Sequence, residues 1–92
     1  MRFTWDEEKD HENIRKHGIS FEIAMEVFHD PLCLTIEDQT VDHEQRLWTI
    51  GSIENHVTLV VVHILFDEVG EEIIRIISAR KATPRERNYY EE

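Results

Sequence analysis

The order of hydrophobic and polar residues divides the chain into a helical first third and a strand-rich remainder. After a short β-prone piece at residues 3–5, Asp6 offers an N-cap to a helix whose first turn is acidic. This helix is predicted to run to about His17. Gly18 then supplies the residue that ends it, because glycine adopts the left-handed conformation at little cost.

A second helix is predicted to follow, with Ser20 as its N-cap. Its apolar residues fall at i, i+3, i+4 and i+7, the spacing of a stripe that faces a core: Phe21, Ala24, Met25 and Phe28. The Asp30-Pro31 pair ends the pattern, since the residue before a proline avoids helical geometry.

From Leu32 onward the period changes to two or to continuous apolar runs rich in Val, Ile and Leu, which indicates strands. Four are predicted, at residues 32–37, 46–53, 57–66 and 73–79. The connections at residues 54–56 and 67–72 have hairpin length, so the last three strands should pair antiparallel in a meander. Three consecutive valines at residues 60–62 suggest that the third of these strands is central and covered on both faces.

A short C-terminal helix completes the prediction. Thr83 is its N-cap, Pro84 occupies the first helical position and Glu86 completes a capping box. Helices before strands indicate an α+β fold: two N-terminal helices, an antiparallel sheet of about four strands and a C-terminal helix. At 92 residues the chain is expected to form a single domain, residues 1–92.

Charge modifies this picture, because the chain carries a net −10 and yet gathers cations near its C-terminus. Residues 75–87 hold Arg75, Arg80, Lys81, Arg85 and Arg87 against Glu86 alone. The overall charge argues against binding of nucleic acid by bulk electrostatics.

No apolar run is long enough to span a bilayer and no signal peptide is evident, so a cytoplasmic protein is expected.

Several familiar sites are excluded by composition and spacing. With three glycines there is no phosphate-binding loop, and a single cysteine cannot build a zinc cluster. The six histidines are spread over several predicted elements without a repeated short spacing. Neither a metal nor a cofactor is predicted.

The segment at residues 74–90 combines groups with complementary chemistry. Guanidinium groups bind phosphate, a carboxylate can accept a hydroxyl proton, and an aromatic ring can stack on a base. Strict alternation along the strand would place Arg75 on the same face as Ile77, and Arg80 on the opposite face with Ser78. On the terminal helix, Glu86 and Tyr90 are i, i+4 neighbours.

These groups predict metal-independent cleavage of RNA by 2′-hydroxyl attack. Arg80 and Arg75 would hold the scissile phosphate and Glu86 would be the general base. Lys81 or Arg87 would stabilise or protonate the leaving oxygen, while Arg46 or Tyr90 would orient the nucleotide.

Plainer alternatives exist for several of these residues. Glu86 could be only the capping-box residue, Tyr90 could pack on the sheet, and Arg46 could merely pair with Glu44. The stripe of Lys9, Asn13 and Lys16 on the first helix is more typical of a solvated face than of a surface that reaches nucleic acid or a partner.

Most of the chain resembles the BrnT family, the toxins of one kind of bacterial type II toxin–antitoxin system. The resemblance rests on KHGISFE at residues 16–22 and RIISARKAT at residues 75–83, with weaker matches at residues 3–6 and 27–31. It implies a RelE-like fold and a ribonuclease that inhibits translation. It also implies a BrnA-type antitoxin that neutralises the toxin. In the toxin–antitoxin complex, only the antitoxin would contact promoter DNA.

The site residues that the resemblance implies are basic and acidic side chains of the sheet and the terminal helix: Arg46, Arg75, Arg80, Lys81, Glu86 and Arg87, with Tyr90 beside them.

The acidic composition motivates an alternative from another class of function. A degenerate, non-catalytic toxin would act only as an interaction module within the antitoxin complex.

Overall fold

The first helix has the boundaries that its capping residues predict. In the computed structural model, which describes residues 1–92 except for the side chain of Val41, α1 spans Glu7–His17. The Asp6 carboxylate accepts hydrogen bonds from the backbone N–H groups of Glu8, at 2.8 Å, and Lys9, at 3.3 Å. Gly18 closes the helix with φ of 71°. No helix within the described residues is long and apolar enough to cross a membrane.

The second predicted helix is present, but its winding changes halfway. It begins as α2 (Phe21–Ala24), capped by Ser20, and tightens into the 3₁₀ segment η1 (Met25–His29) before Asp30. The predicted stripe faces the core: Phe21 and Ala24 are fully buried, and Met25 and Phe28 are half-buried.

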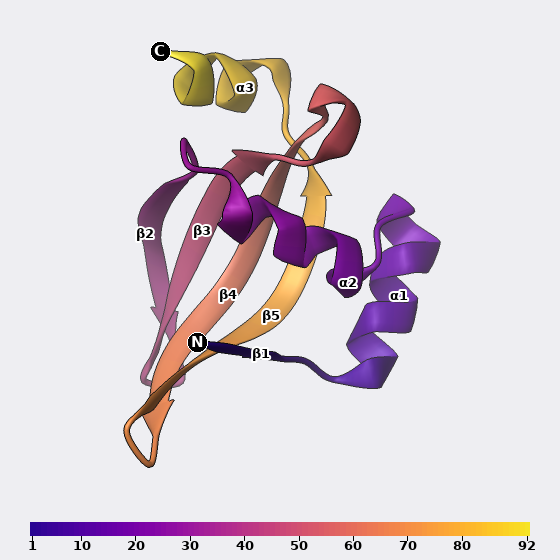
Figure 1. Cartoon of the computed structure of the whole chain (residues 1–92). Helices are drawn as coiled ribbons and strands as arrows, with labels where there is room; N and C mark the ends of the chain where they lie inside the picture. Colours follow the sequence, from indigo (N-terminus) through magenta and orange to yellow (C-terminus); the bar gives the residue numbers. More distant parts are fainter.

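The sheet has five strands instead of the four predicted. They are β1 (Arg2–Thr4), β2 (Leu34–Val41), β3 (Glu44–Ser52), β4 (Thr58–Glu68) and β5 (Glu71–Lys81), in the order β1-β5-β4-β3-β2. β3, β4 and β5 form the predicted antiparallel meander, which β2 extends by one strand, and β4 is the central strand of the five (Figure 1). The additional strand comes from the β-prone N-terminal piece, which pairs parallel with β5.

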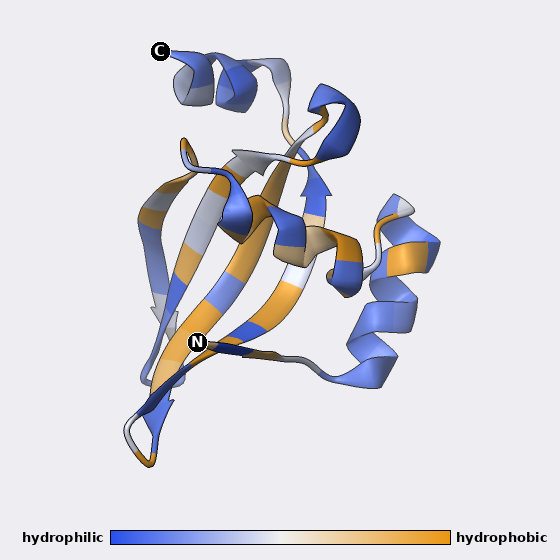
Figure 2. Cartoon of the chain, in the orientation of Figure 1, coloured by the Kyte–Doolittle hydropathy of each residue, from blue (hydrophilic) through white to orange (hydrophobic). Residues whose placement is uncertain are grey.

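The helices cover the two faces of the sheet unequally. α2 and η1 lie across one face, α1 lies beside the edge of β5, and α3 (Pro84–Glu91) lies beyond the strand ends (Figure 1). Apolar residues concentrate on β4, β5 and α2, whereas α1 and α3 are mostly hydrophilic (Figure 2). The core therefore lies between the sheet and the α2–η1 segment, where Phe21, Val27, Leu59, Val61 and Ile76 are fully buried.

A β-bulge in β5 changes which side chains share a face. His63 of β4 pairs with Ile76, but Val62 pairs with Ser78, so Ile77 is an extra residue. Beyond the bulge Ala79 joins Ile76 in the core, and Arg80 pairs with Val60. The prediction from strict alternation is thus wrong: Arg75 and Arg80 share one face, the face not covered by α1 and α2.

The polar stripe of α1 borders the edge of β5: Lys9 and Lys16 are exposed, as expected of a solvated face, but the residue between them is not. Its middle residue, Asn13, is only 5% exposed. The Asn13 amide nitrogen donates to the carbonyl oxygens of Ala79, at 2.8 Å, and Ile19, at 2.9 Å, while its oxygen accepts from the N–H of Ala79 at 3.1 Å. The side-chain amide therefore pairs with Ala79 as a neighbouring strand would, and fixes α1 against the sheet.

Candidate functional site

Two unpaired arginines flank an apolar floor on the open face of the sheet. Arg75 of β5 pairs with Ile64 of β4, and Arg46 of β3 lies on the other side of Ile64, since the next residue, Leu47, pairs with His63. The two Cα atoms are thus separated by two strand spacings, roughly 10 Å. Between them lies a hollow of about 510 Å³, lined by Lys9, Glu44, Arg46, Ile64, Phe66, Arg75 and Ile77.

The guanidinium group of Arg46 makes no hydrogen bond among the described residues. Its Nε atom is buried and has no hydrogen-bond partner, and among the described residues neither Arg46 nor Arg75 forms a salt bridge. Buried polar groups are normally hydrogen-bonded, so this buried donor without a partner is an exception within the fold. Two guanidinium groups on either side of the hollow favour an anion, which they can bind through paired N–H donors.

A second charged group lies further along the same face. The Arg80 guanidinium donates to both carboxylate oxygens of Glu86, at 2.7 and 2.9 Å, and lies 5.4 Å from the centroid of the Trp48 ring. Arg80 and Arg75 oppose β4 residues four positions apart, so their Cα atoms are separated by roughly 13 Å. The long side chains of both residues can converge on a group bound between them, above Ser78 and Val62.

Glu86 is held as a carboxylate by its surroundings. The hydrogen bonds from Arg80 are the main cause that lowers its pKa to about 2, and the backbone N–H of Thr83 also donates to it at 2.9 Å. The predicted capping box is therefore present, with the N–H of Glu86 returning a bond to the Thr83 hydroxyl. A carboxylate with so low a pKa is a weak base while Arg80 holds it.

The remaining predicted site residues lie away from these two groups. Lys81 pairs with Leu59, whose side chain is in the core, so Lys81 projects from the opposite face to Arg80 at the exposed end of β5. Arg87 is exposed on α3. Neither side chain makes a hydrogen bond or salt bridge among the described residues. The structure thus brings together Arg46 with Arg75, and Arg80 with Glu86.

Tyr90 ties α3 to the loop that follows η1. Its hydroxyl donates a short hydrogen bond to Asp30 and accepts one from the Ser52 hydroxyl at 3.2 Å. Burial works against charge on Asp30, but the hydrogen bonds from Ser52, Tyr90 and Leu32 outweigh it and lower the pKa of this carboxyl. A Cβ atom on Gly51 would lie 3.2 Å from Asp30 Oδ2 and 2.9 Å from Val27, so this close packing requires glycine.

Replacing Tyr90 with phenylalanine is expected to destabilise the chain by about 1 to 2 kcal/mol, because Asp30 loses a donor to its charged oxygen. The effect would be measured by urea unfolding. Tyr89→Phe is the matched control, since the Tyr89 side chain is half-exposed and its hydroxyl makes no hydrogen bond in the structure. Equal stabilities of the two variants would show that the bond from Tyr90 to Asp30 contributes nothing.

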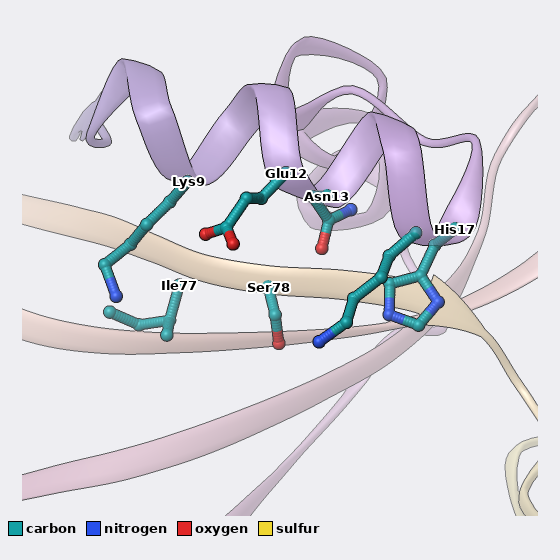
Figure 3. A pocket seen from close by; sticks show the side chains of 7 residues that line it. Lys9, Glu12, Asn13, His17, Ile77 and Ser78 are labelled. Carbon is teal, nitrogen blue, oxygen red and sulfur yellow. The ribbon is translucent and has the colours of Figure 1, made fainter.

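A groove between α1 and β5 continues from the hollow that Arg46 and Arg75 flank. It is lined by Lys9, Glu12, Asn13, Lys16, His17, Ile77 and Ser78, and shares Lys9 and Ile77 with the hollow. Figure 3 shows Lys9, Glu12 and His17 extending from α1 over Ile77 and Ser78 of β5. The open face is therefore bordered by α1 along one side.

The prediction from sequence missed the role of Trp48, which lies on the open face and contacts Arg80. Its signal was weak: an aromatic residue two positions after Arg46 in a predicted strand shares the face of Arg46 by alternation.

Elsewhere among the described residues, no three His, Cys, Asp or Glu side chains are grouped as metal ligands would be.

Comparison with known proteins identifies the fold and the family of this chain. The model of the family described as "Ribonuclease toxin, BrnT, of type II toxin-antitoxin system" matches residues 5–86. The crystal structure of the Brucella abortus ribonuclease toxin BrnT is similar over 90% of this chain and 97% of that one, with 28% sequence identity and a TM-score of 0.57. Among proteins with curated functions, none matches the sequence. The α+β fold is that of the BrnT structure, and the chain belongs to the BrnT family of ribonuclease toxins from type II toxin–antitoxin systems.

Proposed function

We propose that this toxin cleaves RNA without a metal ion, on the open face of the sheet, and thereby inhibits translation. The observation that carries the proposal is the pair of unpaired arginines, Arg46 and Arg75, on either side of the hollow. Neither guanidinium group forms a salt bridge among the described residues, although Glu44 also lines the hollow and the chain has a net charge of −10. Their free donors match the oxygens of a phosphodiester.

The scissile phosphate would lie between Arg75 and Arg80, and Arg46, across the hollow from Arg75, would orient the nucleotide. To bind Arg80 it must compete with Glu86, which occupies the same guanidinium donors in the free protein. Displacement would remove the main cause of the low pKa of Glu86, so the carboxylate would become a stronger base only when substrate is bound. Trp48, against Arg80, offers a ring on which the adjoining base can stack.

The reaction would follow the chemistry available to these groups. The 2′-hydroxyl loses its proton to Glu86 and attacks the adjacent phosphorus, while Arg75 and Arg80 stabilise the charge that develops on the phosphoryl oxygens. The bond to the 5′-oxygen breaks, and this oxygen leaves with a proton from water. The products are a 2′,3′-cyclic phosphate and a 5′-hydroxyl. Lys81 and Arg87, as placed, have no part in this scheme, and Tyr90 supports it by holding α3.

A BrnA-type antitoxin is proposed to neutralise this activity. Outside residues 75–87 the chain is strongly acidic, which suits a basic partner protein. Promoter DNA would then be contacted by the antitoxin and not by this chain.

The proposal is tested by incubating the purified toxin with RNA in excess EDTA. Cleavage is expected to continue, and every new 5′ end should be a hydroxyl that polynucleotide kinase labels without prior phosphatase treatment. Cleavage that stops in EDTA and returns with Mg²⁺ would overturn metal independence. Binding of a BrnA-type antitoxin without RNA cleavage under either condition would favour the non-catalytic interaction module.

A further inference from the structure

Hydrogen bonds hold together the two sides of the groove between α1 and β5, which is lined mostly by polar residues. Asn13 lies at its base and makes three buried hydrogen bonds, two to Ala79 and one to Ile19. Lys9 and Lys16 are four residues before and three residues after Asn13, so they project from the same side of α1. Fixing Asn13 on the sheet therefore places one ammonium group at each end of the groove.

The two lysines are free to bind a ligand. Neither forms a salt bridge among the described residues, although twenty Asp and Glu residues are present in the chain. Lys9 also lines the hollow flanked by Arg46 and Arg75, so the cations of the sheet and those of α1 border one continuous surface. The Ser78 hydroxyl and the His17 ring add hydrogen-bonding groups along it.

We infer that this groove, hereafter the α1 groove, is a second RNA subsite that binds the phosphodiester backbone next to the cleaved bond. This inference rests on the proposed function. The strand would leave the hollow past Lys9 and follow α1 to Lys16 and His17. Because a lysine ammonium binds phosphate as a point charge, the subsite adds affinity and register without reading the sequence.

Glu12 is the one acidic side chain that lines the α1 groove. It lies between Lys9 and Lys16 along the helix, and Figure 3 shows its carboxylate over β5. A phosphodiester bound here is repelled by this carboxylate. Neutralising Glu12 should therefore strengthen binding of RNA, which is the opposite of the effect of removing a lysine.

The first test measures binding of a 2′-O-methyl oligonucleotide of about twelve nucleotides, which the proposed 2′-hydroxyl attack cannot cleave. Lys16→Ala is expected to weaken binding about two- to fivefold. It should also reduce the slope of log K against log salt concentration by about 0.7, the value for one single-strand phosphate contact. Lys9→Ala combined with Lys16→Ala should reduce that slope by about 1.4.

Arg15→Ala is the matched control, because Arg15 does not line the α1 groove but a separate hollow, with Glu8, His11 and Glu12, and its loss changes the net charge equally. It should leave the slope unchanged. In a second pair, Glu12→Gln should tighten binding while Glu8→Gln should not. If Lys16→Ala behaves like Arg15→Ala, or Glu12→Gln behaves like Glu8→Gln, the α1 groove is not a phosphate subsite.

Failure of this inference is distinguishable from failure of the proposed function. A wild-type protein that cleaves RNA in EDTA, with Lys16→Ala and Arg15→Ala equal in both binding and salt slope, overturns only the subsite. Substrate length separates the two further. Cleavage of an oligonucleotide too short to extend from the hollow to Lys16 should be insensitive to Lys16→Ala, whereas cleavage of a long RNA should slow.

Discussion

Replacing Arg75 with alanine is expected to lower kcat/KM for RNA cleavage about 10²- to 10³-fold, the usual cost of removing one preorganised donor to transition-state charge. Arg75 faces the hollow without a salt-bridge partner, so its removal leaves no carboxylate unpaired. The fold should therefore be unaffected. The measurement is the rate of cleavage in excess EDTA, with far-UV circular dichroism to check the structure.

Arg75 is a cleaner test than Arg80. Truncating Arg80 would also leave Glu86 without its partner and Trp48 without its stacked guanidinium, so lost activity and lost stability would be mixed. Arg75→Lys should recover part of the activity because it keeps the charge and loses the bidentate geometry. Arg15→Ala controls for net charge. An Arg75→Ala variant within about threefold of the wild type would remove this residue from the phosphate site.

Replacing Asn13 with alanine is expected to reduce the free energy of unfolding by about 3 kcal/mol. The change breaks three buried hydrogen bonds and leaves the N–H and C=O of Ala79 and the C=O of Ile19 without partners. For a domain of this size the melting temperature should fall by about 10 to 20 °C. Asn13→Asp should not rescue the loss, since a carboxylate cannot donate to either carbonyl oxygen.

Glu12→Ala provides the control for Asn13→Ala in the same thermal melts. It changes the neighbouring residue of α1, which is exposed, and should alter stability by less than about 0.5 kcal/mol. If both variants melted at the wild-type temperature, the Asn13 amide would not be what holds α1 against β5. If both melted equally low, the loss would belong to the helix in general.

Features that depend on a few neighbouring residues were predictable from the sequence. Asp6, Ser20 and Thr83 cap helices as expected, and Gly18 ends α1. The apolar runs located four strands, because period-two burial is a local property. β1 was not recognised as part of the sheet, since its partner in β5 lies some seventy positions away and its three residues carry almost no periodic signal.

The face of the arginines could not be predicted, because it depends on the bulge at Ile77. Arg75 and Arg80 are five residues apart, and in a regular strand an odd separation places two side chains on opposite faces. One additional residue reverses that result. Nothing in the run of Ile76, Ile77 and Ser78 marks the position, since the bulge arises from the register that β4 imposes.

The pairing within the candidate site was also hidden. Arg80 and Glu86 were each recognised as functional groups, but their bidentate contact depends on how α3 folds back against the sheet. That Tyr90 orients the nucleotide stays a prediction, and the structure adds that its hydroxyl donates a hydrogen bond to Asp30. Although Glu86 and Tyr90 are one helical turn apart, their side chains contact different parts of the fold: Glu86 binds Arg80 of β5, and Tyr90 binds Asp30 after η1.

The amide of Asn13 has a consequence for how this sheet can associate. An exposed strand edge is a template for another chain, and growth of a filament requires two such edges on every molecule. Here one side is limited to the three residues of β1 and, further along β5, is closed at Ala79 by Asn13. Only β2, eight residues long, offers a long edge. The sheet can therefore be extended by another chain only at β2. Two molecules that pair through β2 would leave no second long edge, so a filament could not grow.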